Sequence, residues 1–416
     1  MEKIIIQGGR RLEGELDIQG SKNSVLPILA GTVLTDEPCV LHHCPNLRDV
    51  ESAISILRHL GCRVQRQGDT ITVEGSVQRS DIPLDLMREM RSSVIFLGAI
   101  LSRCGQAKMS FPGGCELGPR PVDLHIAGLR KLGAELDDQG GSLEGRAPHL
   151  RGCHVQLSFP SVGATENIML AAACSEGVTT IGNCAKEPEI EDLQDFLCSM
   201  GARITGAGSS TIRIEGVPRL HGTEYSVMPD RIVAATYLAS VASAGGHAQL
   251  HHVYPRHLES VTELLQESGC TLRQEKDSIE IWRDRPLRSL RMVRTMPYPG
   301  FPTDAQSILM ACMLTAQGTS VFVENIFENR YKQVGEMTMM GADIRVNDRT
   351  AVVTGVPRLH GANVQCTDLR GGAALAVAAL AAEGKTEITK ISHIQRGYDD
   401  LEGCLRRLGA DVCRQE

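Results

Sequence analysis

Six copies of one short phrase constrain the fold of this chain more than any other feature. Each copy is a hydrophobic stretch, a glycine, a small residue and then an alternating run that is typical of a strand. The glycines are Gly61, Gly133, Gly201, Gly269, Gly341 and Gly409. Successive copies lie 72 or 68 residues apart, as from 61 to 133 and from 133 to 201. A fixed period indicates one structural unit that is repeated six times.

Every repeat also contains a segment built from small and apolar residues on all sides. These segments are residues 24–35, 92–104, 167–175, 232–244, 306–317 and 371–382. A helix that is apolar all round must be buried all round. Each segment is followed by a strand pattern, an amphipathic helix that ends at the glycine phrase, and two more strands. The sequence therefore predicts an α/β fold of six βαβαββ-type units, with helices inside and sheets outside.

The two ends of the chain complete one another in this pattern. The sixth repeat starts a strand at Asp411, and the chain stops before its partner. Lys3–Gln7 is a strand pattern with no helix before it, so we expect it to close the sixth repeat. Six units in 416 residues favour two domains of three units each. We expect a first domain at 21–228 and a second, discontinuous domain at 1–20 and 229–416.

Charge and cysteine usage argue for an ordinary reduced protein. The net charge is −7 with both signs mixed, which argues against a broad nucleic-acid surface. The fourteen cysteines are scattered, without zinc spacing, and many, such as Cys174 and Cys312, read as small buried hydrophobes. The first residues are too few for a signal peptide, and no apolar run reaches the ~18 residues of a membrane span. We expect a cytoplasmic protein without metal ion, cofactor, nucleic-acid partner or membrane.

Polar and charged residues gather where the buried helices are expected to begin. They are Lys22, Asn23, Arg91, Thr165, Glu166, Asp230, Arg231, Thr303, Asp304, Asp368 and Arg370. Four nearby positions have residue types that suit N-caps: Ser21, Asp230, Thr303 and Asp368. Capping does not explain the lysine and the arginines, because a helix N-terminus disfavours cations. Either an anionic ligand or internal salt bridges must neutralise them.

A glycine- and proline-rich stretch at 111–123 predicts a loop that leads into a helix. Cys115 lies in this stretch, with Arg120 beside the helix start. Such a setting lowers the pKa of a thiol and leaves it accessible, so Cys115 is a candidate reactive cysteine. The alternative is an incidental loop cysteine.

Three further residues have both a structural and a chemical interpretation. Asp304 opens a buried helix and is either an N-cap or a base for a hydroxyl group. Arg330 and Arg396 lie in polar loops next to strand ends, and each taken singly is typical of a surface arginine. No phosphate-binding loop and no dinucleotide fingerprint accompanies them.

Together these motifs resemble the UDP-N-acetylglucosamine 1-carboxyvinyltransferases of the enolpyruvyl transferase family. The matching motifs lie at 20–23, 112–125, 161–165, 301–304, 328–330, 367–370 and 396–398. The resemblance runs from Ile5 to the last repeat. It implies an inside-out α/β barrel of two three-unit domains. It also implies transfer of the enolpyruvyl group of phosphoenolpyruvate to the 3′-hydroxyl of UDP-N-acetylglucosamine, with release of phosphate, at the start of peptidoglycan synthesis.

The resemblance also implies roles for individual residues. Cys115 would protonate the methylene carbon and could form a covalent adduct, on a loop that closes as a lid. Asp304 would take or orient the 3′-hydroxyl proton, and Lys22 and Arg396 complete the catalytic set. The implied substrate-binding residues are Lys22, Asn23, Arg91, Arg120, Pro121, Val122, Asp123, Leu124, Ser161, Val162, Gly163, Asp304, Ile326, Arg330, Asp368 and Arg370. No protein partner is expected beside the two small-molecule substrates.

Three alternatives remain at this point. A 5-enolpyruvylshikimate 3-phosphate synthase would share the six-unit fold and the enolpyruvyl donor, but the Cys115 loop favours the UDP-sugar enzyme. A non-catalytic ring around nucleic acid would place basic residues on exposed helices rather than at the starts of buried ones. A relative that keeps the fold but has lost activity is the third, and the presence of Lys22, Cys115, Asp304 and Arg396 argues against it.

Overall fold

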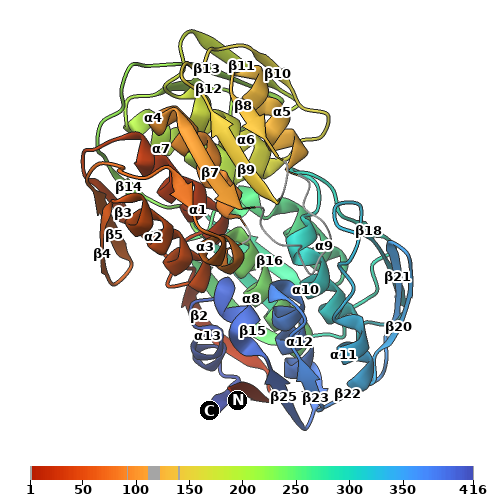
Figure 1. Ribbon diagram of the computed structural model, residues 1–416. Helices are drawn as coiled ribbons and strands as arrows, with labels where there is room; N and C mark the ends of the chain where they lie inside the picture. Colours follow the sequence, from red (N-terminus) through yellow and green to blue (C-terminus); the bar gives the residue numbers. More distant parts are fainter. Residues whose placement is uncertain (1, 91, 111–121, 139–140, 416) are drawn as a thin grey trace. The chain divides into compact units, whose positions relative to one another are not determined.

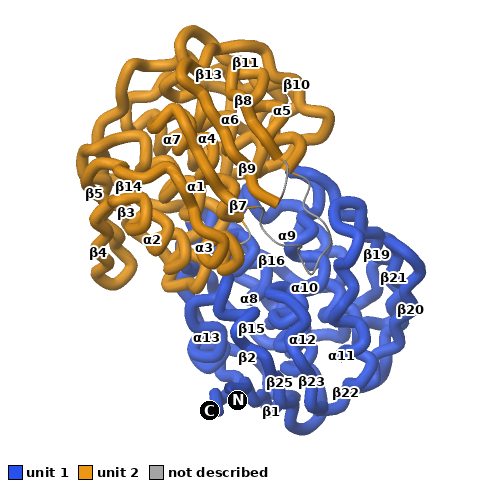
Figure 2. The backbone as a smooth tube through the Cα atoms, in the orientation of Figure 1, with its two compact units in different colours: residues 1–19, 116–118, 229–416 blue, residues 20–115, 119–228 orange. Residues whose placement is uncertain are grey.

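The chain forms two compact units, which Figure 2 shows in different colours. The computed structural model describes residues 2–90, 92–110, 122–138 and 141–415. Unit 1 comprises the described residues up to Gln19 and from Pro229 onward, and unit 2 comprises those from Gly20 to Met228. The chain passes from one unit to the other close to the two crossings that the sequence predicted. That each unit is an independent domain stays a proposal.

Unit 2 holds three of the six repeats (Figure 1). Its helices are α1 (Lys22–Gly31), η1 (Thr32–Leu34), α2 (Arg48–Leu60), α3 (Leu84–Glu89), η2 (Ser93–Ile95), α4 (Phe96–Cys104), α5 (Asp123–Lys131), α6 (Val162–Ala172) and α7 (Pro188–Ser199). Its strands are β3 (Cys39–His42), β4 (Arg63–Gln67), β5 (Thr70–Glu74), β6 (Asp81–Ile82), β7 (Gln106–Ser110), β8 (Glu135–Asp137), β9 (Ser142–Arg146), β10 (His154–Gln156), β11 (Val178–Gly182), β12 (Arg203–Thr205), β13 (Thr211–Glu215) and β14 (Glu224–Ser226).

Unit 1 holds the other three repeats and both ends of the chain. Its helices are α8 (Arg231–Ala244), η3 (Pro255–His257), α9 (Glu259–Glu267), α10 (Thr303–Met313), α11 (Val334–Met339), α12 (Leu369–Ala381), η4 (Ile391–Arg396) and α13 (Leu401–Arg407). Its strands are β1 (Lys3–Gln7), β2 (Leu12–Asp17), β15 (Gly246–His251), β16 (Thr271–Gln274), β17 (Ser278–Arg283), β18 (Val293–Arg294), β19 (Thr319–Val323), β20 (Asp343–Asn347), β21 (Thr350–Thr354), β22 (Leu359–His360), β23 (Asn363–Gln365), β24 (Ala382–Glu383), β25 (Lys385–Thr389) and β26 (Asp411–Gln415).

Each repeat forms one four-stranded sheet with the same order of strands. In the sheet β10-β11-β13-β12, for example, β10 and β11 are parallel, and β13 pairs antiparallel with both β11 and β12. All six repeat glycines have positive φ, between 85° and 109°. Glycine adopts this left-handed conformation without steric cost, so it ends each exposed helix and turns the chain into the next strand. This requirement explains the phrase that recurs in the sequence.

The leading strands of two repeats are exchanged, and the exchange closes each unit. β2 precedes α1 in the chain but pairs in parallel with β15 of unit 1. β14 precedes α8 but pairs in parallel with β3 of unit 2. Each set of three sheets is thereby linked within its own unit. The sequence pattern did not indicate this exchange.

The N-terminal strand completes the sixth repeat, as predicted. β1 lies between β25 and β26 and pairs antiparallel with both. It takes the place that β13 has in the third repeat. Both ends of the chain therefore lie side by side in unit 1 (Figure 1).

Three of the six apolar helices form the centre of each unit, and the fold is the predicted inside-out α/β barrel. In unit 1, α8, α10 and α12 are buried along almost their whole length. Cys312 Sγ, near the end of α10, donates to the carbonyl of Ala239 in the second half of α8 at 3.2 Å. Ser243 Oγ in α8 donates to the carbonyl of Val377 in α12 at 3.1 Å. These contacts join residues at similar positions along each helix, so the helices run parallel and begin at the same end.

Some expected boundaries and burials were wrong. α6 begins at Val162 and α10 at Thr303, before the predicted starts at 167 and 306. The pattern missed the first turn of α6 because its Thr165 and Glu166 are polar yet buried. Cys312 is buried as expected, whereas Cys174 is only partly buried because it follows the end of α6. Among the described residues, no helix is long and apolar enough to cross a membrane.

Candidate functional site

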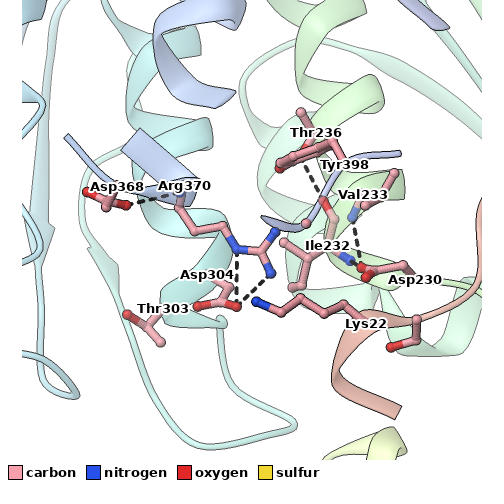
Figure 3. A network of polar contacts seen from close by, with 12 residues as sticks. Lys22, Asp230, Ile232, Val233, Thr236, Thr303, Asp304, Asp368, Arg370 and Tyr398 are labelled. Carbon is pink, nitrogen blue, oxygen red and sulfur yellow. Dashed lines mark hydrogen bonds and ion pairs between the residues drawn. The ribbon is translucent and has the colours of Figure 1, made fainter. Parts of the chain in front are cut away.

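Two buried arginines hold the carboxylate of Asp304 in the first turn of α10. Arg330 Nη2 lies 2.6 Å from Oδ1, and Arg370 donates to Oδ2 from Nη2 at 2.9 Å and from Nε at 3.2 Å. Figure 3 shows the contact between Arg370 and Asp304. The side chains of Arg330 and Arg370 are 2% and 4% exposed, whereas that of Asp304 is 27% exposed. The carboxylate is thus the only one of the three groups in this ion cluster that is substantially exposed to solvent.

The cluster determines the charge state of Asp304. Burial alone raises the pKa of this carboxyl, but Arg370 and Arg330 outweigh burial and hold the pKa well below the ordinary value. Burial also opposes the charge of Arg370, yet Asp304 raises the pKa of that guanidinium. Asp304 is therefore a stable anion and a weak base, better suited to orient a hydroxyl group than to keep its proton.

The parallel helices bring the members of this cluster together. Asp304 and Arg370 are each the second residue of their helix, so the ends of α10 and α12 meet at the ion pair. Asp368 caps α12 and accepts from the backbone N–H groups of Arg370 and Gly371. Asp230 caps α8 in the same manner, as Figure 3 also shows. These two N-caps are confirmed.

Three other interpretations of residues at this end of unit 1 were wrong. Thr303 is not an N-cap, because it lies inside α10 after Pro302 and its hydroxyl donates to Glu324 Oε2 at 3.0 Å. Asp304 is likewise in the first turn and not at the cap. Arg330 is no surface arginine, because the ion pair with Asp304 and two bonds to the Thr303 carbonyl hold it inside.

Arg396 lies at the end of η4, on a segment packed against the start of α12. A Cβ at Gly397 would lie 2.7 Å from Leu369 Cδ2, so the backbone approaches α12 closely. Arg396 is half-buried. Ile326 follows β19 on the short loop that leads to Arg330. Within unit 1, the structure therefore gathers the predicted residues from four separate stretches of sequence around the first turns of α10 and α12.

Unit 2 presents a second group of predicted residues, beginning with Lys22. Ser21 caps α1 by accepting from Ser24 N, and Lys22 and Asn23 form the first turn. Lys22 Nζ lies 2.7 Å from Asp49 Oδ2, and their side chains are 12% and 3% exposed. Asp49 comes from the first turn of α2. The cation at this helix start is balanced by an internal carboxylate.

The other predicted residues of unit 2 lie at the adjacent starts of α5 and α6. Residues 122–124 begin α5, and Ser161 caps α6 through Ala164 N. A Cβ at Gly163 would lie 2.9 Å from His125 Cε1, so the two segments are in contact. Asn167 Nδ2 lies 2.8 Å from His125 Nδ1 and links the helices a turn further on. Two motifs separated by almost forty positions in the chain are thus brought together.

Internal ion pairs neutralise Lys22 and Arg370, and the alternative of an anionic ligand stays a prediction. Four predicted site residues lie outside the described residues: Arg91, Cys115, Arg120 and Pro121. The part of the chain that the structure describes contains no cluster of His, Cys, Asp or Glu side chains suited to a metal ion.

Sequence reasoning missed Asp49 and Glu324. Asp49 lies in an amphipathic helix and gave no signal beyond a favourable acidic residue in a first turn. Glu324 directly follows an apolar strand, and a charged residue there is buried to 1% exposure. This abrupt change from apolar to charged residues was the available signal. The side-chain partners of Glu324, Thr295 and Thr303, are too far away along the chain to be inferred from spacing.

Comparisons with known proteins cover the whole chain. The family model described as EPSP synthase (3-phosphoshikimate 1-carboxyvinyltransferase) matches residues 6–405. A curated relative in Caldanaerobacter subterraneus subsp. tengcongensis, UDP-N-acetylglucosamine 1-carboxyvinyltransferase 2, is 50% identical over 100% of both chains. UDP-N-acetylglucosamine 1-carboxyvinyltransferase 1 of Symbiobacterium thermophilum is 48% identical, over 99% of this chain and 95% of its own.

Solved structures show the same fold. The enolpyruvyl transferase NikO from Streptomyces tendae superposes with a TM-score of 0.89 at 26% identity, over 100% of this chain and 99% of its own. EPSP synthase from Acinetobacter baumannii has a TM-score of 0.77 at 18% identity, over 100% of both chains. The second likeness is one of fold alone.

Proposed function

Because the chain belongs to the EPSP synthase family of enolpyruvyl transferases, we propose that it transfers the enolpyruvyl group of phosphoenolpyruvate to the 3′-hydroxyl of UDP-N-acetylglucosamine. The observation that carries this choice of acceptor is the relative of that name, 50% identical along its entire length. In this proposal the enzyme is cytoplasmic, and its product enters peptidoglycan synthesis.

The reaction is an addition followed by an elimination. The 3′-oxygen bonds to C2 of phosphoenolpyruvate while the methylene carbon takes a proton, which gives a tetrahedral adduct. Loss of a proton from that carbon and cleavage of the bond between C2 and the phosphate oxygen then release inorganic phosphate and leave the enolpyruvyl ether. We propose that Cys115 donates the proton to the methylene carbon.

The geometry of Asp304 supports a specific role in the first step. Its carboxylate is ionised, partly exposed and fixed by Arg330 and Arg370. Such a group accepts a hydrogen bond from the 3′-hydroxyl and orients the oxygen for attack. Because two guanidinium groups already stabilise its negative charge, it does not retain the proton, which passes on towards phosphate or solvent. We therefore propose orientation as its role.

The remaining predicted residues are proposed to bind the two substrates. Phosphate and carboxylate groups suit lysine and arginine, so we propose that Lys22, Asn23, Arg120, Arg330, Arg370 and Arg396 serve phosphoenolpyruvate. For the UDP-sugar we propose Arg91, Arg120, Pro121, Val122, Asp123, Leu124, Ser161, Val162, Gly163, Asp304 and Ile326. Asp368 contributes by holding the start of α12, which carries Arg370.

Release of phosphate with two alternative acceptors tests the proposal. Purified full-length protein is given phosphoenolpyruvate with either UDP-N-acetylglucosamine or shikimate 3-phosphate. We expect phosphate release that depends on the UDP-sugar and is absent with shikimate 3-phosphate. The opposite preference would make the chain a 3-phosphoshikimate 1-carboxyvinyltransferase, the activity in the description of the matching family model. No release with either acceptor would favour a relative that has lost activity.

A further inference from the structure

Glu324 lies where two parallel strands end. It directly follows β19, and Thr295 directly follows its parallel neighbour β18. Their side chains meet because parallel strands end at the same edge of a sheet. Thr295 Oγ1 donates to Glu324 Oε1 at 3.0 Å, and the two residues are 0% and 1% exposed. A carboxylate this deeply buried requires donors for both oxygens.

One oxygen of Glu324 shapes the loop that carries Ile326. The backbone N–H groups of Ile326 and Phe327 donate to Oε1 at 2.8 and 3.0 Å. The guanidinium of Arg330 then lies 5.6 Å from the centre of the Phe327 ring. We call these two backbone hydrogen bonds to Oε1 the loop arm of Glu324. The loop arm fixes the backbone at Ile326 and the course of the loop that leads to Arg330.

The other oxygen holds the first turn of α10. Thr303 Oγ1 donates to Glu324 Oε2 at 3.0 Å, while the carbonyl of Thr303 accepts from Arg330 Nε and Nη2 at 3.2 and 3.0 Å. Thr303 is thus held from two sides, and the next residue is Asp304. We call the hydrogen bond between Thr303 Oγ1 and Glu324 Oε2 the helix arm of Glu324. The helix arm determines the position of the Asp304 carboxylate.

We infer that Glu324 is a positioning residue of the transferase, which couples the placement of Ile326 to that of Asp304. It acts through these residues and is not itself expected to touch substrate. The inference rests on the proposed function for its kinetic consequence. Its structural consequence, the ordering of the loop at 325–330 by one carboxylate, holds for any activity of this site.

Three substitutions separate the two arms. Glu324→Gln keeps a carbonyl oxygen for Thr295, Ile326 and Phe327, while its NH2 group donates to Thr303 Oγ1, so the helix arm keeps a neutral hydrogen bond in place of a charge-assisted one. Thr303→Val removes the same helix arm from its other side. Glu324→Ala removes both arms. The matched control is Glu402→Ala, which deletes a carboxylate that is also buried in unit 1 but lies in α13 beside Arg414.

Steady-state kinetics should distinguish these variants. Loss of the helix arm misplaces Asp304, so Thr303→Val should lower kcat about tenfold with little change in the KM for UDP-N-acetylglucosamine. Glu324→Gln only weakens this arm and should lower kcat by a smaller factor. The double variant should be no worse than Thr303→Val, because that substitution already breaks the contact. Glu324→Ala should also raise that KM, with kcat/KM about 100-fold lower. Glu402→Ala should behave as the unsubstituted enzyme.

Hydrogen exchange keeps the inference testable without activity. The amides of Ile326 and Phe327 should exchange faster in Glu324→Ala but not in Glu324→Gln. Unchanged exchange in Glu324→Ala, additive losses in the double variant, or equal kinetics in Glu324→Ala and Glu402→Ala would overturn the inference. If Glu324→Ala does not fold, the kinetics of Glu324→Gln, Thr303→Val and their double variant decide whether Glu324 positions Asp304. Absence of turnover in the unsubstituted enzyme would instead count against the proposed function, and exchange alone would decide the role of Glu324.

Discussion

At the scale of single residues, the charge of Asp304 is the feature on which the site depends. Arg330 and Arg370 are almost completely buried, and Asp304 is the carboxylate that pairs with both. Removing one partner of a buried ion pair leaves the others uncompensated, which costs far more than losing a surface pair. The same arrangement that orients a hydroxyl group therefore also stabilises the centre of unit 1.

Asp304→Asn should destabilise unit 1 by about 3 kcal/mol, because both arginines lose their counter-charge. Denaturant unfolding followed by Trp282 fluorescence measures this, since the single tryptophan of the chain lies in unit 1. The control is Glu383→Gln, which breaks an exposed pair with Arg358 and should cost less than about 0.5 kcal/mol. Equal effects of the two substitutions would contradict the buried-cluster account.

The pH dependence of stability should reveal the lowered pKa of Asp304. A depressed folded-state pKa adds stability that is complete above the unfolded value, about 3.9, and is lost as the pH falls below it. The advantage of the unsubstituted protein over Asp304→Asn in free energy of unfolding should thus be constant from about pH 8 to pH 5 and shrink below about pH 4. An advantage that already declines between pH 7 and pH 5 would show that the two arginines do not dominate.

At the scale of elements, the first turn of α12 depends on close approach of backbone to side chains. The pair Gly371 and Gly372 is a poor start for a helix by propensity. A Cβ at Gly372 would lie 2.8 Å from both Cys366 Sγ and Ile394 Cγ1. The glycine therefore allows η4, which ends at Arg396, to pack against the helix that carries Arg370. This packing explains why glycine stands at a helix position that propensity alone would give to another residue.

Gly372→Ala should destabilise the protein by about 1–2 kcal/mol, although alanine is the better helix former, because overpacking outweighs propensity. Gly335 in α11 provides the matched control, since nothing lies within 4 Å of a Cβ there. Gly335→Ala should stabilise by up to about 1 kcal/mol. Thermal unfolding of both variants tests the comparison, and stabilisation by Gly372→Ala would refute the packing argument.

The sequence predicted the elements that leave a local pattern of residues and missed the features that depend on contacts between distant residues. The repeat glycines and the apolar helices were found because local conformation and burial leave local patterns. The first turn of α6 was missed because Thr165 and Glu166 are polar but buried. The pairing of Asp304 with Arg370 was missed because the two residues are 66 positions apart and only the packing of α10 against α12 brings them together.

At the scale of the whole molecule, each unit is completed by a strand from elsewhere in the chain. β1 lies between two strands of the last repeat, and its Ile4 and Ile6 are 1% and 0% exposed in the core of unit 1. β2 and β14 are exchanged between repeats and link three sheets within each unit. The sequence predicted the closure by β1 from a missing strand, but the exchange left no trace in any single repeat.

Ile6→Ala should cost unit 1 about 2–5 kcal/mol, as expected for truncation of a fully buried isoleucine. Ile5 in the same strand is less buried, so Ile5→Ala should cost less than half as much. Trp282 fluorescence during denaturant unfolding reports both values. Similar small losses at the two positions would argue against β1 as part of the core.

The most direct test of the central claim is the structure of the product. Full-length protein is incubated with phosphoenolpyruvate and UDP-N-acetylglucosamine, and the nucleotide sugar is then analysed by mass spectrometry and NMR. The account predicts an enolpyruvyl ether at the 3′-oxygen, formed in equal amount with inorganic phosphate. Unmodified UDP-N-acetylglucosamine, or an enolpyruvyl group at another position, would contradict it.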